Sequence, residues 1–311
     1  MASGYAVVLV TYNRLTLLKE CLEQVENQTI PPEKIIVVNN ASTDGTAEYL
    51  QENKEKNACY HIVTCAQNIG GAGGFEKGLQ ASAKEDVECV LLIDDDAMLE
   101  KAYMEKIMAV RKHYPGYLAF AGAVMTNGKI DTCHRKNIVR PGLLQKNCPE
   151  GYYTGENEKR PFSCDAASFC GMVVDKGLVG KVGFPCGEYF IWHDDTEYSM
   201  RINRYSRFLV VPDARLDHKT AANVRKHPHR RYEWREYYGI RNRILYVRKH
   251  GNALDRAVNG ADMFCNIVLR NWLFGAVNMD GYDWKYEKRL VREAYRDAKA
   301  KKPVCRGIPD F

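Results

Sequence analysis

Short apolar runs alternate with segments of helical periodicity over the first hundred residues of the chain. Strands that are buried on both faces of a sheet are mostly apolar without polar alternation. Runs of this kind occupy residues 5–11, 34–40, 60–65 and 89–93. Apolar positions recur at helical spacing between these runs, over residues 15–28, 46–53 and 75–83. This order of elements predicts a parallel sheet with right-handed crossovers, typical of a nucleotide-binding α/β half-domain.

Beyond residue 100 the pattern is less regular. Further helices are predicted at residues 103–113, 178–182, 194–204, 232–250, 255–277 and 284–299. Further strands are predicted at residues 118–125, 165–174 and 208–211. The polar segment 127–160 has no strong period. We therefore expect a mixed α/β chain whose last part is helical.

Composition is that of an ordinary globular protein, with 45% apolar and 27% charged residues among 311 and a net charge of +6. The 11 cysteines are scattered without a C-x-x-C pair, so we expect free thiols in a reducing cytoplasm and no zinc site. No apolar run approaches the roughly 20 residues of a membrane span. The first residues lead straight into a strand, so we expect no signal peptide and a cytoplasmic location.

Three aspartates, Asp94, Asp95 and Asp96, directly follow the apolar run 89–93. Unpaired buried charge is costly, so they should emerge at the carboxyl end of the strand, where open α/β sheets bind ligands. Because side chains alternate along an extended chain, Asp94 and Asp96 can point to the same side. Two carboxylates suit Mg²⁺ or Mn²⁺. A solvated acidic turn is the alternative.

Polar loops follow the first two strands, and a glycine-rich segment follows the third. Residues 11–14 and 39–45 carry hydroxyl, amide and carboxylate groups that could bind a base or ribose, although each alone is an ordinary turn. Residues 70–74 contain four glycines, which let backbone approach a ligand closely. We expect this segment to be a loop before a helix at 75–83, whose free N–H groups would face an anion.

Carboxylates and a histidine occur together in the second half of the chain. Asp194, Asp195 and Glu197 follow the aromatic residues 189–192. A carboxylate in a partly apolar pocket can act as a general base, although acidic residues also favour the first turn of a helix. His218 follows a predicted strand, and a neutral imidazole can complete a metal site that two aspartates begin.

Together these motifs resemble family 2 glycosyltransferases with the GT-A fold. The resemblance rests on Val-Thr-Tyr-Asn-Arg (10–14), Asn-Asn-Ala-Ser-Thr-Asp-Gly (39–45), the Asp-Asp-Asp strand and Asp-Asp-Thr-Glu-Tyr (194–198), and it covers about residues 5–218. Asn-Ile-Gly-Gly-Ala-Gly-Gly-Phe (68–75) and Trp-His-Asp-Asp-Thr-Glu (192–197) are most similar to the galactofuranosyltransferase and rhamnosyltransferase branch.

The resemblance implies a GT-A catalytic domain over residues 1–225 and a helical region over 226–311. The catalytic domain would comprise a nucleotide-binding half (1–100) and an acceptor half (101–225), built on a mostly parallel central sheet flanked by helices.

The resemblance also implies roles for individual residues. The nucleotide-diphosphate donor would be held by Thr11, Tyr12, Arg14, Asn39, Asn68, Gly70, Gly71 and Asp95. The metal ligands would be Asp94, Asp96 and His218, and the catalytic base would be Asp195, with Asp194 or Glu197 orienting the acceptor. Asn39 stands where many relatives have aspartate, which leaves open whether the donor base is uracil or thymine.

The implied reaction is a metal-dependent, inverting transfer of a galactofuranose- or rhamnose-like sugar from a UDP or dTDP donor. The acceptor would be a hydroxyl of a glycan or of a lipid-linked acceptor in polysaccharide biosynthesis. A sugar-nucleotide nucleotidyltransferase is one alternative, but it should carry a glycine-rich loop after its first strand. A non-catalytic nucleotide-sugar binding module is another, and it would not need Asp195.

Positive charge and aromatic residues are concentrated after residue 218. The basic set comprises Lys219, Arg225, Lys226, His227, His229, Arg230, Arg231, Arg235, Arg241, Arg243, Arg248 and Lys249. The aromatic and apolar set comprises Tyr232, Trp234, Tyr237, Tyr238, Trp272, Leu273 and Phe274. No nucleic-acid motif accompanies them, so no nucleic-acid partner is expected. They predict either a solvated helix face with buried tyrosines or a surface that binds anionic lipid on the inner face of the plasma membrane.

Overall fold

The computed structural model describes residues 4–219, 232–269, 272–273, 283–300, 307 and 309. The chain forms two compact units, each assembled from more than one segment. The first comprises Met1–Asn137, Asn147–Gly187 and Asp195–Ala221, and the second comprises Ile138–Lys146, Glu188–Asp194 and Ala222–Phe311. The predicted division at residue 225 stays a prediction; the second unit also takes in two earlier segments.

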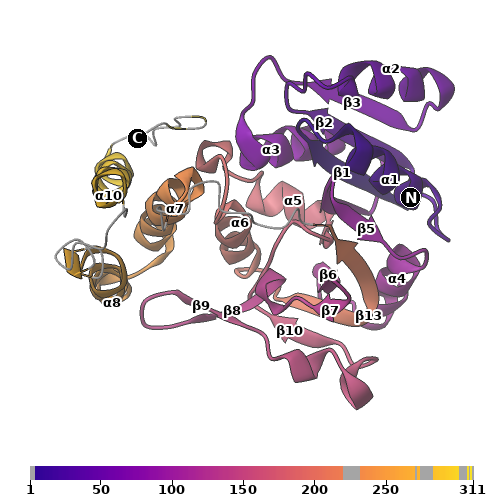
Figure 1. Cartoon of the computed structure of the whole chain (residues 1–311). Coiled ribbons are helices and arrows are strands. Elements are labelled where there is room, and N and C mark those ends of the chain that lie inside the picture. Colours follow the sequence, from indigo (N-terminus) through magenta and orange to yellow (C-terminus); the bar gives the residue numbers. More distant parts are fainter. Residues whose placement is uncertain are drawn as a thin grey trace. The chain divides into compact units, whose positions relative to one another are not determined.

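A large mixed sheet forms the centre of the first unit (Figure 1). Its main path runs in the order β10-β13-β6-β12-β4-β1-β2-β3, while β5 pairs with β13 and β7 with β6. The strands are β1 (Tyr5–Thr11), β2 (Lys34–Asn39), β3 (Tyr60–Thr64), β4 (Cys89–Asp94), β5 (Ala97–Leu99), β6 (Ala119–Thr126), β7 (Lys129–Ile130), β10 (Phe162–Cys164), β12 (Met172–Asp175) and β13 (Phe208–His218). The first four long strands, β1 to β4, run parallel, as the sequence predicts.

Helices cover both faces of this sheet. They are α1 (Leu15–Glu26), α2 (Thr46–Lys56), α3 (Gly70–Ser82), α4 (Tyr103–His113), α5 (Lys176–Val182) and α6 (Asp194–Ile202). The chain also forms the 3-10 turns η1 (Thr132–His134), η2 (Glu150–Tyr152), η3 (Gly155–Asn157) and η4 (Gly187–Tyr189). Val7 and Leu9 of β1 pack in one apolar core with α1 and α4, and Val8 packs in another with α3 and α6. The apolar runs therefore mark strands with two buried faces.

The glycine-rich segment is helical, so the prediction of a loop over residues 70–74 is wrong. Helix α3 begins at Gly70 and passes so close to β1 that only glycine fits. A Cβ at Gly74 would lie 2.4 Å from Val10 Cγ1, and one at Gly78 would lie 2.3 Å from Val8 Cγ1. The glycines thus allow close helix–sheet packing, which outweighs their low intrinsic helix propensity.

Two other predicted elements differ in their bounds. The strand predicted at 165–174 is interrupted at Gly171, whose positive φ of 79° separates β11 (Ala166–Ala167) from β12. β11 pairs with β8 (Arg135–Val139). The segment 127–160, which has no sequence period, contains β7, η1, β8, β9 (Leu144–Asn147), η2 and η3. Such short elements are too brief to show a period.

The second unit is mainly helical. It contains α7 (Trp234–His250), α8 (Ala253–Met263), the π-helix η5 (Phe264–Leu269) and α10 (Trp284–Lys299). Its core joins Tyr237 and Tyr238 of α7 to Leu290 of α10 and Met263 of α8. One helix is predicted at 255–277, but the α-helix in the structure ends at Met263. Residues 270, 271 and 274–277 of the predicted helix lie outside the described residues.

Not all side chains of the predicted basic and aromatic surface are exposed. Arg241 is completely buried and Arg243 is paired with Asp262, so neither adds to an exposed basic face. Tyr237 and Tyr238 are also buried, as the alternative of a helix with buried tyrosines predicts. Seven residues of the predicted surface lie outside the described part of the chain, namely Arg225, Lys226, His227, His229, Arg230, Arg231 and Phe274.

Neither a membrane-spanning helix nor a disulfide occurs in the described residues. None of the helices there combines the length and the apolar character that crossing a bilayer demands. The ten cysteines that the structure describes are free thiols, as predicted.

Candidate functional site

The predicted donor-site residues meet at the carboxyl ends of β1, β2 and β4. Thr11 is in register with Asn39 across β1 and β2, and Val10 is in register with Asp94 across β1 and β4. β1 lies between β4 and β2, so the strand order changes direction at this point. Ligands of open α/β sheets bind at such a switch point.

Asp95 is held by two of the three predicted binding residues of the first loop, Thr11 and Arg14. Its Oδ2 accepts a hydrogen bond from Thr11 Oγ1 at 2.7 Å, and its Oδ1 contacts Arg14 Nη1 at 3.1 Å. The side chain is buried. Burial raises the pKa of Asp95 to about 6, although Arg14 and Thr11 favour the ionised form.

Asp96 lies between a guanidinium and an imidazole. Its Oδ2 contacts Arg14 Nη1 at 2.6 Å, and its Oδ1 faces His218 Nε2 at 3.2 Å. Burial alone would raise the pKa of Asp96, but His218 and Arg14 together hold it below its usual value. Burial would likewise lower the pKa of His218, yet its contact with Asp96 keeps that pKa raised. The ion pair is therefore charged on both sides.

Among the three aspartates, Asp94 has the pKa that is raised most. Burial and the neighbouring Asp96 and Asp95 raise the pKa of Asp94 to about 7. Three carboxylates here share the positive charges of Arg14 and His218, and both of those groups contact Asp96 directly. Carboxylate oxygens with an imidazole are a donor set that a divalent cation such as Mn²⁺ accepts, so the chemical types of these residues suit a metal.

The second loop and the start of α3 are joined through asparagine side chains. Asn40 Nδ2 donates to Asn68 Oδ1 at 3.0 Å and to the Gly70 carbonyl at 3.1 Å, while Asn68 Oδ1 also accepts the Gly70 N–H. Asn39 Oδ1 accepts the Ser42 N–H at 2.9 Å. These contacts order the loops. A Cβ at Gly71 would meet no atom within 4 Å, so this glycine faces open space.

Tyr12 is 39% exposed at the same sheet edge, so its ring is accessible to a ligand. Asn13, the next residue, has a positive φ of 52°, and its Oδ1 accepts the Thr43 N–H at 2.7 Å. The first two loops are therefore tied to each other, as a shared binding surface requires.

Asp195 lies on α6 beside a histidine that the sequence does not single out. A small cavity of about 10 Å³, enough for about one water molecule, is lined by Asp195, Thr196, His134, Cys133 and neighbouring residues. The His134 ring packs edge-on against the His218 ring, with centroids 5.0 Å apart. His134 thus connects the surroundings of Asp195 to the ion pair of His218 and Asp96.

Asp131, Cys133 and His134 form the one group in the described residues whose three potential metal-ligating atoms lie within 4.8 Å of one another. Asp94, Asp96 and His218 do not form such a group. Asp131 also accepts hydrogen bonds from Thr126 Oγ1 and the Cys133 N–H. These three residues come from the segment without a period, so only their residue types could have drawn attention to them.

The two other carboxylates near Asp195 differ in environment. Asp194 is buried and belongs to the second unit. Glu197 is completely buried and contacts Arg201 Nη2 at 2.9 Å. Because Arg201 also donates to the Val182 and Phe184 carbonyls, Glu197 is part of a packed interior network. The role of Glu197 in orienting an acceptor stays a prediction.

The fold and this sheet edge define a nucleotide-sugar transferase architecture. Residues 6–181 match the model of glycosyl transferase family 2, which is more than half of the chain. The chain belongs to this family, as its motifs predict.

Two relatives and one solved structure show the range of similarity. Poly-beta-1,6-N-acetyl-D-glucosamine synthase of Staphylococcus epidermidis is 33% identical over 97 residues, which cover 30% of this chain and 23% of that protein. Galactofuranosyltransferase GlfT1 of Mycobacterium tuberculosis is 28% identical over 210 residues, 66% of either chain. The crystal structure of GalNAc-T7 with UDP, GalNAc and Mn²⁺ is 14% identical and has a TM-score of 0.65, covering 94% of this chain and 54% of that one. This likeness confirms the predicted GT-A fold.

Proposed function

We propose that this chain transfers a sugar from a UDP-linked donor to a hydroxyl of a glycan or lipid-linked acceptor, with inversion and with the help of Mn²⁺ or Mg²⁺. The observation that carries the proposal is the cluster of Asp94, Asp95 and Asp96 beside Arg14 and His218 at the switch point of the sheet. The family match and the UDP and Mn²⁺ in the GalNAc-T7 structure support it. The likeness to GlfT1 favours a galactofuranose-like donor sugar.

Each residue at the sheet edge has a proposed role. Thr11, Tyr12, Arg14 and Asn39 would hold the base and ribose, with Asp95 fixed by Thr11 and Arg14. Asn68, Gly70 and Gly71 would face the diphosphate. Asp94, Asp96 and His218 would hold the divalent cation, whose charge would stabilise the departing diphosphate.

The proposed reaction is a single displacement. Asp195 takes the proton from the acceptor hydroxyl, and the acceptor oxygen forms a bond to the anomeric carbon. The bond from that carbon to the diphosphate breaks on the opposite face, so the configuration inverts and UDP leaves. Asp194 would assist by orienting the acceptor.

We expect UDP and Mn²⁺ to bind cooperatively. Calorimetric titration with UDP should give a clearly lower Kd when Mn²⁺ is present, because the cation offsets the repulsion between the diphosphate and the three carboxylates. Asp96→Ala should remove this difference, whereas Asp217→Ala, an exposed neighbour of His218 on β13, should keep it. Equal UDP affinity with and without Mn²⁺ in the unchanged protein would contradict the metal assignment.

The same titration has an expected pH dependence. Because burial raises the pKa of Asp94 to about 7, this carboxyl must lose a proton before it can bind a cation. The effect of Mn²⁺ on UDP affinity should therefore grow from about pH 6 to about pH 8, with protons released on binding. A coupling that weakens over this range would exclude Asp94 as a ligand.

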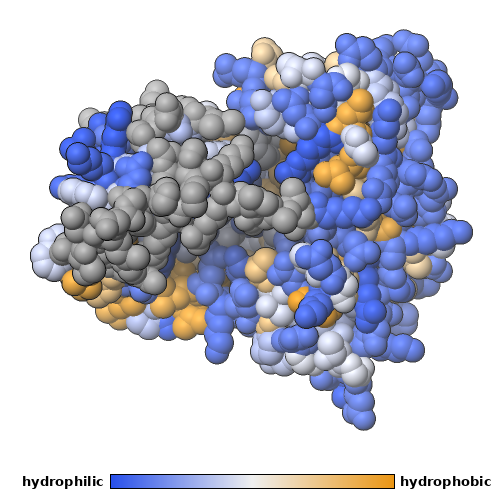
Figure 2. Space-filling model, viewed as in Figure 1, coloured by the Kyte–Doolittle hydropathy of each residue, from blue (hydrophilic) through white to orange (hydrophobic). Residues whose placement is uncertain are grey.

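We also propose that the second unit contacts anionic membrane, where a lipid-linked acceptor would be found. Apolar side chains are exposed at the start of α8, in η5 and beyond. They are Leu254, Phe264, Val268, Leu269, Trp272 and Leu273. Orange atoms lie at the lower left of Figure 2, where Figure 1 draws α8. Trp272 is 67% exposed, and exposed aromatic residues suit a lipid interface.

Vesicle co-sedimentation tests this surface. Binding should require anionic lipid, fade with added salt and weaken in Trp272→Ser. The variant Tyr205→Ser, which changes an aromatic residue of the first unit that is 55% exposed, should bind as the unchanged protein does. Equal and weak sedimentation with neutral and anionic vesicles at low salt would overturn the membrane proposal without affecting the glycosyltransferase proposal.

A further inference from the structure

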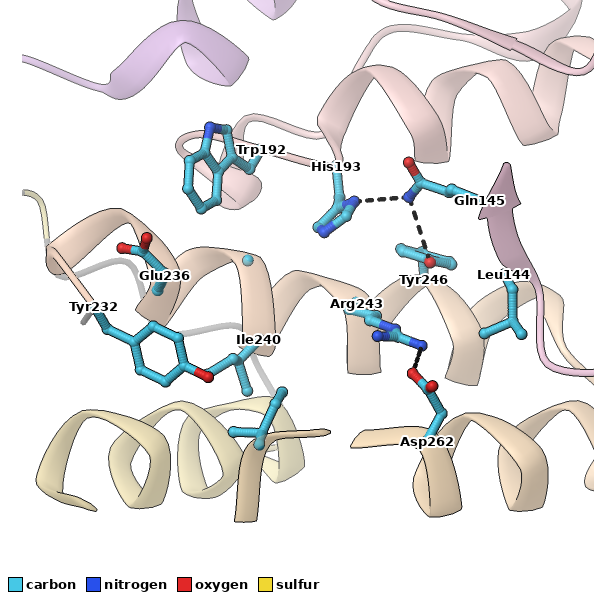
Figure 3. A pocket seen from close by; sticks show the side chains of 12 residues that line it. Leu144, Gln145, Trp192, His193, Tyr232, Glu236, Ile240, Arg243, Tyr246 and Asp262 are labelled. Atoms are coloured by element: carbon cyan, nitrogen blue, oxygen red, sulfur yellow. Dashed lines mark hydrogen bonds and ion pairs between the residues drawn. The ribbon is translucent and has the colours of Figure 1, made fainter. Parts of the chain in front are cut away.

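The second unit contains a cavity of about 550 Å³, which falls in the range of about 300–1,000 Å³ typical of small-molecule sites (Figure 3). Its lining combines aromatic, aliphatic and charged side chains from α7, α8, β9, η5, the segment 188–194 and Tyr232, which precedes α7. The polar members that Figure 3 labels are Gln145, His193, Glu236, Arg243 and Asp262. The aromatic members are Trp192, Tyr232 and Tyr246.

One wall of this cavity is a strained backbone segment. Phe190, Trp192 and His193 each have a φ of +64°, a left-handed conformation that is unfavourable for bulky side chains. Such strain persists only where surrounding structure enforces it, and it is concentrated at binding and catalytic sites. Trp192 and His193 are the two strained residues that line the cavity.

Helix α7 enforces this conformation from the buried side. Asn242 Nδ2 lies within hydrogen-bond distance of three carbonyls, those of Tyr189 at 2.9 Å, Ile191 at 2.9 Å and Trp192 at 2.7 Å. Arg241 Nη2 donates to the Glu188 carbonyl at 2.6 Å. Two buried polar side chains of α7 therefore hold the backbone of the segment that carries Trp192 and His193.

The polar groups of the cavity are arranged in fixed pairs. Gln145 Nε2 contacts His193 Nδ1 at 3.0 Å and the Tyr246 hydroxyl at 3.5 Å, and Arg243 Nη2 contacts Asp262 Oδ2 at 2.6 Å. The Trp192 indole lies against Gly239, where an added Cβ would be 2.9 Å from its Cε3 atom. Trp192 is nevertheless 42% exposed, so its ring remains available to a ligand.

The charges in the cavity favour a neutral ligand with many hydroxyls. The lining holds two carboxylates, Glu236 and Asp262, against one guanidinium, Arg243, which is already paired with Asp262. A phosphate would therefore be repelled rather than attracted. A sugar ring presents apolar C–H faces to aromatic rings and hydroxyls to amide, imidazole and carboxylate groups, which matches this lining.

We propose that this cavity binds a sugar residue of the acceptor glycan, an inference that rests on the proposed glycosyltransferase function. His193 precedes Asp194 and Asp195 directly in the chain, and α6 begins at Asp194. A segment shaped by Asn242 and Arg241 thus leads without interruption into the proposed catalytic base. Trp192 and His193 are sugar-binding residues, and Asn242 and Arg241 are positioning residues.

Saturation-transfer NMR with the full chain tests this site directly, without any catalytic step. The probes are methyl β-D-galactofuranoside, methyl α-L-rhamnopyranoside and methyl 2-acetamido-2-deoxy-β-D-glucopyranoside. At least one should receive saturation, and Trp192→Ala should weaken its binding about tenfold. Trp284→Ala is the matched control, because Trp284 is 39% exposed in the same unit and does not line the cavity.

Gly239→Ala provides a second variant that keeps every polar group and favours the helix. Its new methyl group should displace the Trp192 ring and weaken glycoside binding, while the affinity for UDP stays unchanged. Binding of no glycoside, or equal binding by Trp192→Ala and Trp284→Ala, would overturn the sugar site. Failure of UDP to bind the unchanged protein would instead overturn the proposed function, so the two failures are distinguishable.

Discussion

Asp195→Asn should lower the rate of sugar transfer by about 10²–10⁴-fold, the usual contribution of a general base, while leaving the Kd for UDP unchanged. An amide cannot accept the proton of the acceptor hydroxyl. The substitution should not disturb the fold, since the remaining carbonyl oxygen can still accept the Thr196 N–H that Asp195 Oδ1 accepts now. Release of UDP from a UDP-sugar, with and without acceptor, measures the rate.

Asp194→Asn is the matched control for this experiment. It changes the same functional group one residue earlier, at a buried side chain grouped with the second unit. If Asp194→Asn abolishes turnover and Asp195→Asn does not, the assignment within the pair is wrong. If the unchanged protein binds a UDP-sugar but neither transfers nor hydrolyses it, the chain is better described as a nucleotide-sugar binding module.

Asn242→Ala should destabilise the second unit by about 3 kcal/mol, because it removes both N–H donors of an amide that lies within hydrogen-bond distance of three backbone carbonyls of the segment 188–194. Asn242 is completely buried, so water cannot readily replace its amide. The strained φ angles of Trp192 and His193 would then lose the contacts that hold them. We expect glycoside binding to be lost together with stability.

Intrinsic tryptophan fluorescence makes this prediction easy to measure. The four tryptophans are Trp192, Trp234, Trp272 and Trp284, and all belong to the second unit. A urea titration followed by fluorescence therefore reports on this unit alone. Asn266→Ala is the control, because it removes a single exposed hydrogen bond, from Asn266 Nδ2 to Asp262. Equal midpoints for the two variants would show that Asn242 does not hold the segment.

Much of the sheet could be predicted because strand signals are local. The apolar runs at β1, β2 and β4 match the structure to within a residue, since each strand is buried on both faces and needs apolar side chains throughout. The glycine-rich segment was harder to interpret. Glycine weakens an isolated helix, and only the approach of α3 to Val8 and Val10 of β1 explains why glycine is required there.

The candidate donor site was also largely predictable, for a topological reason. Parallel strands bring the residues after their carboxyl ends to one sheet edge, so Thr11, Arg14 and Asp95 had to meet once β1 and β4 were adjacent. His218 joins them because β13 runs on past its predicted end to reach that residue, where its imidazole meets Asp96. The individual roles of these residues stay predictions until ligand binding is measured.

The sequence by itself determined the alternation of strands and helices, the acidic end of β4 and the family, because local periodicity and short motifs carry that information. Only the tertiary structure decided that His134 packs on His218, that Glu197 is enclosed with Arg201, and that Arg241 and Asn242 shape the segment of Trp192 and His193. These contacts join residues whose positions in the chain carry no common period. Burial and hydrogen-bond satisfaction select them, and both are properties of the packed chain rather than of any one segment.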